Sequence, residues 1–256
     1  MGLLPFPMLY SHLPTDRFLL SPGEEPVKVF EYMGRERFGN LWDKVQSLEI
    51  GLRSTQLFLH GNMGCGKSHM LAALACLLFR LGKRPVYLSN CRQMLADPLP
   101  YIQSAMLCSF AATSSPDQRN KIRSFRNTED AIQFCRTLGE TRLYFIIDQV
   151  NALEQEEPNA DLVPNSEKET LLNFLHRISV GHYSITSASA NYRTARRMAR
   201  KQTGELKMSM MGGMSTVRNP LWMLCLLISI RFYFSGGDET VVVSSPGQTA
   251  HFQRHV

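Results

Sequence analysis

The chain has 256 residues, of which 44% are hydrophobic and 20% charged, with a formal net charge of +6. This composition excludes a disordered chain, which would combine low hydrophobicity with high net charge, and the length suits one mid-sized domain with appendages. The longest apolar run, residues 221–230, is too short for the roughly 18 residues of a membrane-spanning helix. We therefore predict no membrane segment and no membrane partner.

The N-terminus and the cysteines argue against a secreted scaffold. Residues 1–10 lack the basic start and the small-residue cleavage site of a secretory signal, which predicts a cytoplasmic or nuclear location. No CxxC pair or metal-ligand spacing occurs among the cysteines, so we expect reduced thiols and no zinc site. The six cysteines are Cys65, Cys76, Cys91, Cys108, Cys135 and Cys225.

The first predicted elements follow an irregular start. Residues 1–26 are rich in proline and lack periodicity, which predicts an extended arm. A helical pattern lies within residues 27–51, and an apolar run predicts a buried strand at residues 56–60. Helical spacing resumes near Lys67 and stops at Gly82, a residue that commonly ends a helix.

The rest of the domain alternates between strands and helices. Strands are predicted at residues 84–89, 143–148 and 182–187, and helices at residues 98–112, 128–138 and 166–178. A polar, basic loop is expected between the first two of these helices, and residues 159–165 are expected to form a loop. The alternation predicts an α/β fold with a three-layer parallel sheet. We assign this domain to residues 27–215 and describe residues 216–256 as an atypical tail.

A glycine-rich loop follows the first buried strand directly. Residues 61–68, GNMGCGKS, satisfy the pattern G-x-x-x-x-G-K-[ST] in full. Glycines allow close backbone approach, and successive N–H groups together with the positive end of the next helix can cradle a β-phosphate. We expect Lys67 to bridge the β- and γ-phosphates and Ser68 to ligate Mg²⁺. The predicted nucleotide-binding residues are Gly61, Asn62, Met63, Gly64, Cys65, Gly66, Lys67, Ser68 and His69.

A carboxylate at a later strand end completes the prediction. Asp148 ends the apolar run LYFIID; such an aspartate is commonly only a cap, but beside a phosphate loop it is predicted to hold Mg²⁺ with Ser68. One strand lies between the loop and Asp148 and another follows, an order similar to the additional-strand P-loop ATPases, which include the AAA+ and STAND groups. In that class a glutamate usually comes next. Gln149 can orient a water but cannot accept its proton.

The predicted catalytic residues are therefore Lys67, Asp148 and Gln149. Hydrolysis is expected to be slow, to use Glu154 or another carboxylate, or to need a partner. Candidate sensors of the γ-phosphate are Ser187, Ser189 and Asn191, and candidate charge-stabilising arginines are Arg193, Arg196 and Arg197; each could equally be an ordinary surface residue. The side chains of His60, His69 and His176 favour core or surface positions, and Cys65 is not expected to be a catalytic thiol.

These motifs resemble the P-loop region of Crinkler-type proteins of fungi and oomycetes. The discriminating parts are DQ-x-NAL around Asp148 and SAN-x-x-TA around Asn191, and the resemblance spans roughly residues 27–215. It implies an additional-strand P-loop NTPase with Lys67 and Ser68 in the phosphate and Mg²⁺ roles and Asp148 in the second metal role. It also implies that a glutamine after the aspartate is usual in the family.

The resemblance further implies a setting. Members are often secreted effectors directed at host cells and host nuclei, and many carry a nuclease domain and are thought to act on DNA. This chain departs from the pattern because its N-terminal arm does not look like the family's ubiquitin-like header. The residues after Met214 also lack a nuclease motif. That tail is explained either by a frameshift or misread intron, or by a genuine helix and hairpin that complete the sheet.

The sequence thus predicts binding and hydrolysis of ATP or GTP with Mg²⁺. One alternative is a nucleotide-gated switch with little turnover, because Gln149 cannot act as a general base. Another is a nucleic-acid-binding effector fragment that acts through the basic run at residues 193–201. A truncated, poorly folding product is the last alternative. DNA and a host protein are the candidate partners, and the oligomeric state stays open.

Overall fold

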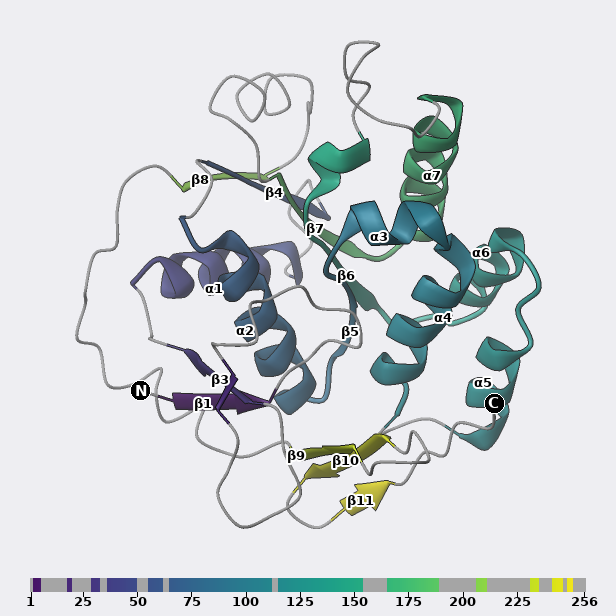
Figure 1. The fold of residues 1–256 in the computed structure, drawn as a ribbon, viewed down its shortest axis with the longest axis horizontal. Coiled ribbons are helices and arrows are strands. Elements are labelled where there is room, and N and C mark those ends of the chain that lie inside the picture. The colour runs from purple at the N-terminus through teal and green to yellow at the C-terminus, as the bar shows by residue number, and fades with distance from the viewer. Residues whose placement is uncertain are drawn as a thin grey trace.

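A five-stranded sheet forms the centre of the computed structural model (Figure 1). The structure describes residues 2–5, 18–19, 29–32, 36–49, 55–61, 65–111, 115–153, 165–188, 206–210, 231–234, 241–245 and 248–250. The sheet contains β4 (Gln56–Gly61), β5 (Arg84–Leu88), β6 (Leu143–Ile147), β7 (Tyr183–Ser187) and β8 (Leu206–Met210). All neighbouring pairs are parallel.

The strand order in space is β5-β6-β7-β4-β8. The chain passes from β4 to β5 and β6 before it returns to β7, so β7 is the strand inserted between β4 and β6. Leu59 of β4 pairs with Ser187, and Ile147 of β6 pairs with Thr186. Consequently the carboxyl ends of these three strands meet at one edge of the sheet, where ligands of open α/β sheets bind.

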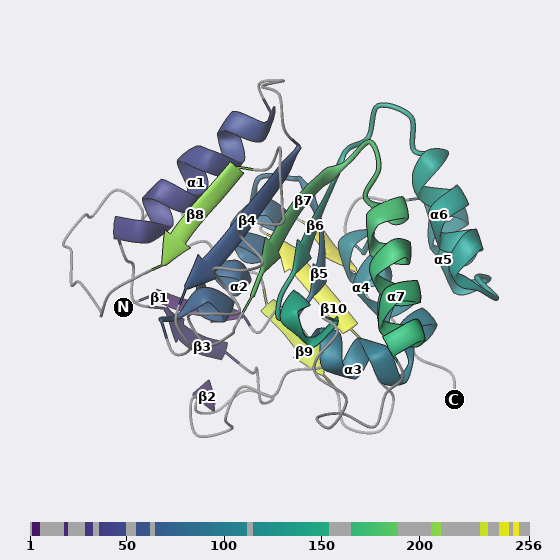
Figure 2. The same ribbon diagram turned by 90° about the horizontal axis from the view of Figure 1, so that it is seen from above.

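Helices cover both faces of the sheet, which confirms the three-layer α/β prediction (Figure 2). One face packs on α1 (Glu36–Glu49) and α2 (Lys67–Arg80); the other packs on α3 (Cys91–Ala96), α4 (Pro98–Ser109), α5 (Pro116–Arg123), α6 (Thr128–Arg136) and α7 (Asn165–Ile178). Successive side chains of β6 point to opposite faces of the sheet and so contribute to both hydrophobic cores. Tyr144 and Ile146 enter the α1–α2 core, whereas Leu143, Phe145 and Ile147 enter the other.

Several elements differ from the sequence predictions, three of them within the α/β domain. The expected polar, basic loop contains the helix α5, which the apolar pattern missed because only Ile122 of this helix is buried. Ser115 at its N-cap and Pro116 at its first position were the available signals. The short helix α3 and the edge strand β8 were also not predicted; five residues are too few to establish a period.

Two smaller antiparallel sheets lie outside the central one. Within the predicted arm, β1 (Gly2–Pro5) and β2 (Phe18–Leu19) pair with β3 (Val29–Tyr32). In the tail, β9 (Arg231–Phe234), β10 (Val241–Ser245) and β11 (Gln248–Ala250) pair in the order β11-β10-β9. None of the described helices has the length and apolar character needed to cross a membrane.

Candidate functional site

Gly61 ends β4 in close contact with the neighbouring strand β8. Its φ is +153°, and a Cβ built there would lie 2.5 Å from the Met210 carbonyl oxygen and 2.8 Å from the Met210 Cβ. Real Cβ atoms do not approach so closely, so any larger residue would push β8 away. The first glycine of the phosphate-loop pattern is therefore required by the packing of two strands.

Gly66 is the second glycine of the loop whose backbone conformation disfavours a side chain. It caps the N-terminus of α2 with φ 84° and ψ 21°, a left-handed conformation that favours glycine. Its carbonyl accepts the first helical hydrogen bond, from Met70 N at 3.1 Å. The helix begins at Lys67, as the sequence predicted. Asn62, Met63 and Gly64 lie outside the described residues, so their phosphate contacts stay a prediction.

Lys67 is folded back under the loop. Its side chain is only 3% exposed. The Nζ donates hydrogen bonds to the Gly61 carbonyl oxygen at 3.0 Å and to the Cys65 Sγ at 3.3 Å. The buried ammonium thus contacts the first residue of the phosphate loop and a cysteine within the loop. Cys65 and His69, the neighbouring binding candidates, are both half-buried.

Asp148 lies just beyond β6 and is 1% exposed. Its backbone N–H extends the sheet by donating to the Leu88 carbonyl at 2.8 Å. Its Oδ1 accepts hydrogen bonds from the Gln149 N–H at 2.9 Å and from the Ser187 hydroxyl. Its Oδ2 is buried and has no hydrogen-bond partner among the described residues. A buried carboxylate oxygen without a partner is costly in a folded chain.

The electrostatics of Asp148 connect it to the phosphate loop. Burial raises the pKa of this carboxyl above its usual range. The hydrogen bonds from Ser187 and the Gln149 amide, the nearby Ser68 hydroxyl and the charge of Lys67 act in the opposite direction and lower the pKa. The structure therefore brings together the loop residues Lys67 and Ser68 and the strand-end residue Asp148, which lie about eighty positions apart in the sequence.

These donor atoms fit Mg²⁺. A carboxylate and a hydroxyl are hard oxygen ligands, and the buried Asp148 Oδ2 still lacks a partner. In the described part of the chain, no group of three or more histidine, cysteine, aspartate or glutamate side chains could hold a metal. The site thus suits an ion that uses one carboxylate and takes its other ligands from phosphate and water, as Mg²⁺ commonly does.

Gln149 has an unusual backbone for its residue type. Its φ is 60°, the left-handed region that costs a side-chain-bearing residue about 1–2 kcal/mol. The Gln149 carbonyl accepts a hydrogen bond from Ala152 N at 2.9 Å, which opens the short 3₁₀ helix η2 (Val150–Leu153). Strained residues of this kind cluster at functional sites. The sequence identified Gln149 by its chemistry, but nothing in the sequence revealed this conformation.

Two further residues support the site. Ser187, one of the sensor candidates, is 0% exposed and fixes Asp148 through its hydroxyl. Tyr87 was missed by the sequence analysis; its hydroxyl donates to the Ser68 carbonyl at 3.3 Å. The only signal for Tyr87 in the sequence was its hydroxyl group, which lies near the end of the otherwise apolar strand β5. The candidates Ser189, Asn191, Arg193, Arg196 and Arg197 and the possible base Glu154 lie outside the described residues.

The structure gives the positions of most of the histidines and cysteines considered in the sequence. His60 stacks on Phe58 with ring centroids 5.9 Å apart, and burial lowers its pKa. His176 is on the exposed side of α7. The five cysteines in the described ranges are free thiols.

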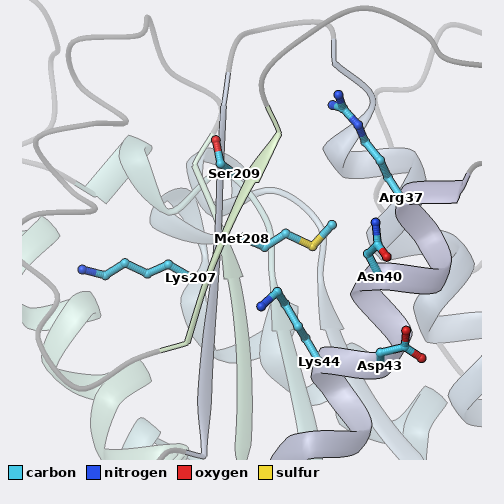
Figure 3. A pocket seen from close by; sticks show the side chains of 7 residues that line it. All are labelled: Arg37, Asn40, Asp43, Lys44, Lys207, Met208 and Ser209. Atoms are coloured by element: carbon cyan, nitrogen blue, oxygen red, sulfur yellow. The ribbon is translucent and has the colours of Figure 1, made fainter.

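A separate cavity of about 470 Å³ lies between α1 and the edge strand β8 (Figure 3). It is lined by Arg37, Asn40, Asp43, Lys44, Lys207, Met208 and Ser209. In Figure 3 Met208 points toward α1, whereas Lys207 points to the other side of β8. None of the predicted nucleotide-binding residues lines this cavity, so we treat it as distinct from the phosphate site.

The sheet order and the position of the loop define the fold class. A glycine-rich loop runs from β4 into α2, Asp148 follows β6, and β7 lies between these two strands. This is the parallel-sheet P-loop NTPase fold with an additional strand. No known protein family matches the chain, and a search of curated proteins also finds no match.

Two of the solved structures that match the chain are distant likenesses. A DNA replication initiation factor has 16% sequence identity and a TM-score of 0.40, and covers 75% of this chain and 50% of its own. The pCW3 conjugation coupling protein TcpA, in a monomer form with ATPγS, has 13% identity and a TM-score of 0.34, and covers 79% of this chain and 60% of its own. The chain thus spans only 50% and 60% of the lengths of these two proteins. The strand order and the position of the loop place the chain among proteins with a P-loop NTPase fold.

Proposed function

We propose that this chain binds a nucleoside triphosphate with Mg²⁺ and hydrolyses its γ-phosphate. The observation that carries the proposal is the convergence of Lys67, Ser68 and Asp148 at one edge of the sheet. A phosphate loop without a carboxylate partner would suit many anions. The buried carboxylate beside Ser68 adds the requirement for a divalent cation, which favours a triphosphate substrate.

Each residue has a proposed role that follows from its position. The Lys67 ammonium, now hydrogen-bonded to the Gly61 carbonyl, would contact the β- and γ-phosphates. Ser68 and Asp148 would hold Mg²⁺, which when bound neutralises charge that develops on the phosphates. Gln149 would orient the attacking water, and Ser187 would keep the Asp148 carboxylate in place. The N-terminus of α2 would stabilise the phosphates through its backbone N–H groups.

The experiment measures two quantities on the full chain, namely nucleotide binding and phosphate release with ATP or GTP and Mg²⁺. We expect Lys67→Ala to reduce turnover by at least about 100-fold and Asp148→Asn to remove the Mg²⁺ dependence of binding. Lys83→Ala is the matched control because Lys83 is exposed and lies beyond the far end of α2. Turnover that survives Lys67→Ala, or a folded chain that binds neither nucleotide, would refute the proposal.

Gln149 favours a second candidate, a nucleotide-gated switch with little turnover. An amide provides no general base, and such a base is worth about 10²–10⁴-fold in rate. Under this alternative the chain binds MgATP but releases phosphate very slowly, and Gln149→Glu increases the rate. A wild-type chain that already turns over at an ordinary rate, with no gain in Gln149→Glu, would exclude the switch.

The resemblance to Crinkler-type proteins supplies a finer hypothesis about setting. It rests on DQ-x-NAL at Asp148 and SAN-x-x-TA at Asn191, and it suggests action on DNA in a host cell. Stimulation of phosphate release by double-stranded DNA would support this hypothesis. Unchanged turnover and no DNA binding would count against it without affecting the nucleotide proposal.

A further inference from the structure

The helix α5 and its flanking residues form a basic segment at the surface of the described domain. Residues 115–127 carry four basic side chains and one acid, a net charge of +3 in a chain whose total is +6. The basic residues are Arg119, Lys121, Arg123 and Arg126. In both views α5 lies at the periphery of its helix layer, beside α6 (Figures 1 and 2). We define these thirteen residues as the α5 surface.

Most of these cations project into solvent. Lys121, Arg123 and Arg126 are all exposed, and none of them forms an ion pair with a described acid. The nearest acids are already engaged, because Glu129 pairs with Arg177 at 2.6 Å and the Asp130 carboxylate accepts the backbone N–H of Arg126 at 2.8 Å. The charges of Lys121, Arg123 and Arg126 are therefore available to a partner.

The α5 surface is also rigidly held. Ile122 is fully buried, and Phe125 packs edge-on against Phe134 with ring centroids 5.6 Å apart. From α4, the Gln103 amide donates hydrogen bonds to the carbonyls of Ile122 and Phe125, each at 3.1 Å. A helix of eight residues is too short to be stable alone, so these contacts keep its basic side chains in a fixed arrangement.

We propose that the α5 surface binds the phosphodiester backbone of a nucleic acid. Arginine and lysine, supported by amides and hydroxyls, make most protein contacts to phosphate oxygens, and Asn120 and Ser124 are exposed beside the cations. This proposal concerns a surface separate from the phosphate loop and does not depend on hydrolysis. It places the contact on α5 rather than on the basic run at residues 193–201.

Two other anionic partners fit less well. A membrane-surface helix needs an exposed apolar face, but the only apolar residue of α5 beyond its N-terminal proline is Ile122, which is buried. Protein interfaces are centred on exposed aromatic or apolar anchors. The exposed large hydrophobic side chains of the described chain are Leu81, Leu172 and Val180, and none belongs to the α5 surface.

The test measures binding of the full chain to fluorescein-labelled 24-residue oligonucleotides, single- and double-stranded, from 50 to 300 mM salt. The test variant combines Lys121→Gln, Arg123→Gln and Arg126→Gln. The matched control combines Lys83→Gln, Arg92→Gln and Lys207→Gln, which removes the same charge from exposed positions elsewhere. We expect the test variant to bind at least about tenfold more weakly at 100 mM salt and to lose about two to three from the salt slope.

The control is expected to stay within about threefold of the wild type, and Lys67→Ala, which disables the nucleotide site, is expected to bind oligonucleotides normally. Melting curves and nucleotide binding verify that the α5 variant is folded. Equal weakening of both triple variants would overturn the proposal. So would loss of binding only on neutralising Arg196 and Arg197, α5-dependent binding to phosphatidylserine vesicles but not to oligonucleotides, or no binding by the folded wild type at 50 mM salt.

Discussion

The ends of β4 and β6 lie at the same edge of one sheet but are built on different principles. At the end of β4 the chain packs Gly61 closely against Met210, and the Gly61 carbonyl accepts a hydrogen bond from the Lys67 ammonium. At the end of β6 the described residues leave Asp148 Oδ2 without a partner, and Gln149 is held in a left-handed conformation. The β4 end is closely packed, whereas the β6 end keeps unfavourable features that a bound cation would relieve.

This difference separates two kinds of sequence constraint. A residue at the β4 end is restricted by space, so its substitution should act mainly on folding. At the β6 end the restriction is chemical, so a substitution there could stabilise the free chain while it damages binding. The following changes test this contrast.

The largest effect on stability is expected for Gly61→Ala. The new Cβ would meet Met210 at 2.5–2.8 Å, so β8 must shift, at a cost of about 2–3 kcal/mol in the free energy of unfolding. Gly82→Ala is the matched control: Gly82 also has a positive φ, of +68°, but nothing lies within 4 Å of its Cβ. Urea unfolding of both variants gives the comparison. Equal losses would mean that conformation, and not the contact with β8, determines Gly61.

Asp148→Asn is expected to affect folding and binding in opposite directions. Burial raises the carboxyl pKa, so the folded chain holds this proton more tightly than the unfolded chain does. The resulting destabilisation grows as pH rises from the usual aspartate range through the raised pKa, and is complete above it. Without Mg²⁺, the variant should therefore melt a few degrees above the wild type at neutral pH and equal it in strong acid.

The Asp148→Asn variant should also lose the stabilisation that MgATP gives the wild type. Calorimetry with and without MgATP measures both effects, and Asp117→Asn on the exposed face of α5 is the control. If Asp148→Asn destabilises the metal-free chain at pH 7, the carboxylate is better satisfied than its surroundings indicate.

A smaller effect is expected for Ser187→Ala. Loss of the hydroxyl removes a hydrogen bond that lowers the Asp148 pKa, so that pKa should rise further. Because Mg²⁺ binds the carboxylate, we expect Mg²⁺-dependent nucleotide binding to weaken about threefold to tenfold, most strongly at low pH. Titrations between pH 5 and 8 measure this. Ser184→Ala on the same strand is the control, and an equal loss there would assign the effect to packing.

The smallest effect concerns the backbone of Gln149. Gln149→Gly and Gln149→Ala both remove the amide, but only glycine relieves the positive φ. The glycine variant should be more stable than the alanine variant by about 1 kcal/mol. Denaturant unfolding of the two variants measures the difference in their free energies of unfolding, which reports the cost of the left-handed backbone. If alanine is the more stable of the two, the left-handed conformation carries no strain.

The parts of this molecule that have a strong period or a fixed spacing could be predicted from the sequence. The β4–loop–α2 unit and the strand before Asp148 were located within one residue, because apolar runs and glycine positions encode them locally. The helix α5 was missed because a single buried Ile122 produces no period. The edge strand β8 was missed because its pairing with β4 connects residues about 150 positions apart.

Contacts between distant elements set the remaining site details. The hydrogen bond between Ser187 and Asp148 and the contact between Gly61 and Met210 each join different strands, and no local pattern encodes either one. The sequence supplied Lys67, Ser68 and Asp148 as candidates; their convergence required the sheet order. The orientation of Gln149 depends on the turn into η2, which the sequence also did not reveal.

The position of β7 between the two halves of the site has a consequence for insertions and deletions. Ser187 pairs with Leu59 on one side and bonds to Asp148 on the other. If the start of β7 keeps its register, deleting one residue within the strand would bring Ala188 to this position, with no hydroxyl to offer, and would reverse the faces of the side chains after the deletion. A one-residue deletion in β7 should therefore disturb both halves of the site, although neither Lys67 nor Asp148 would be changed.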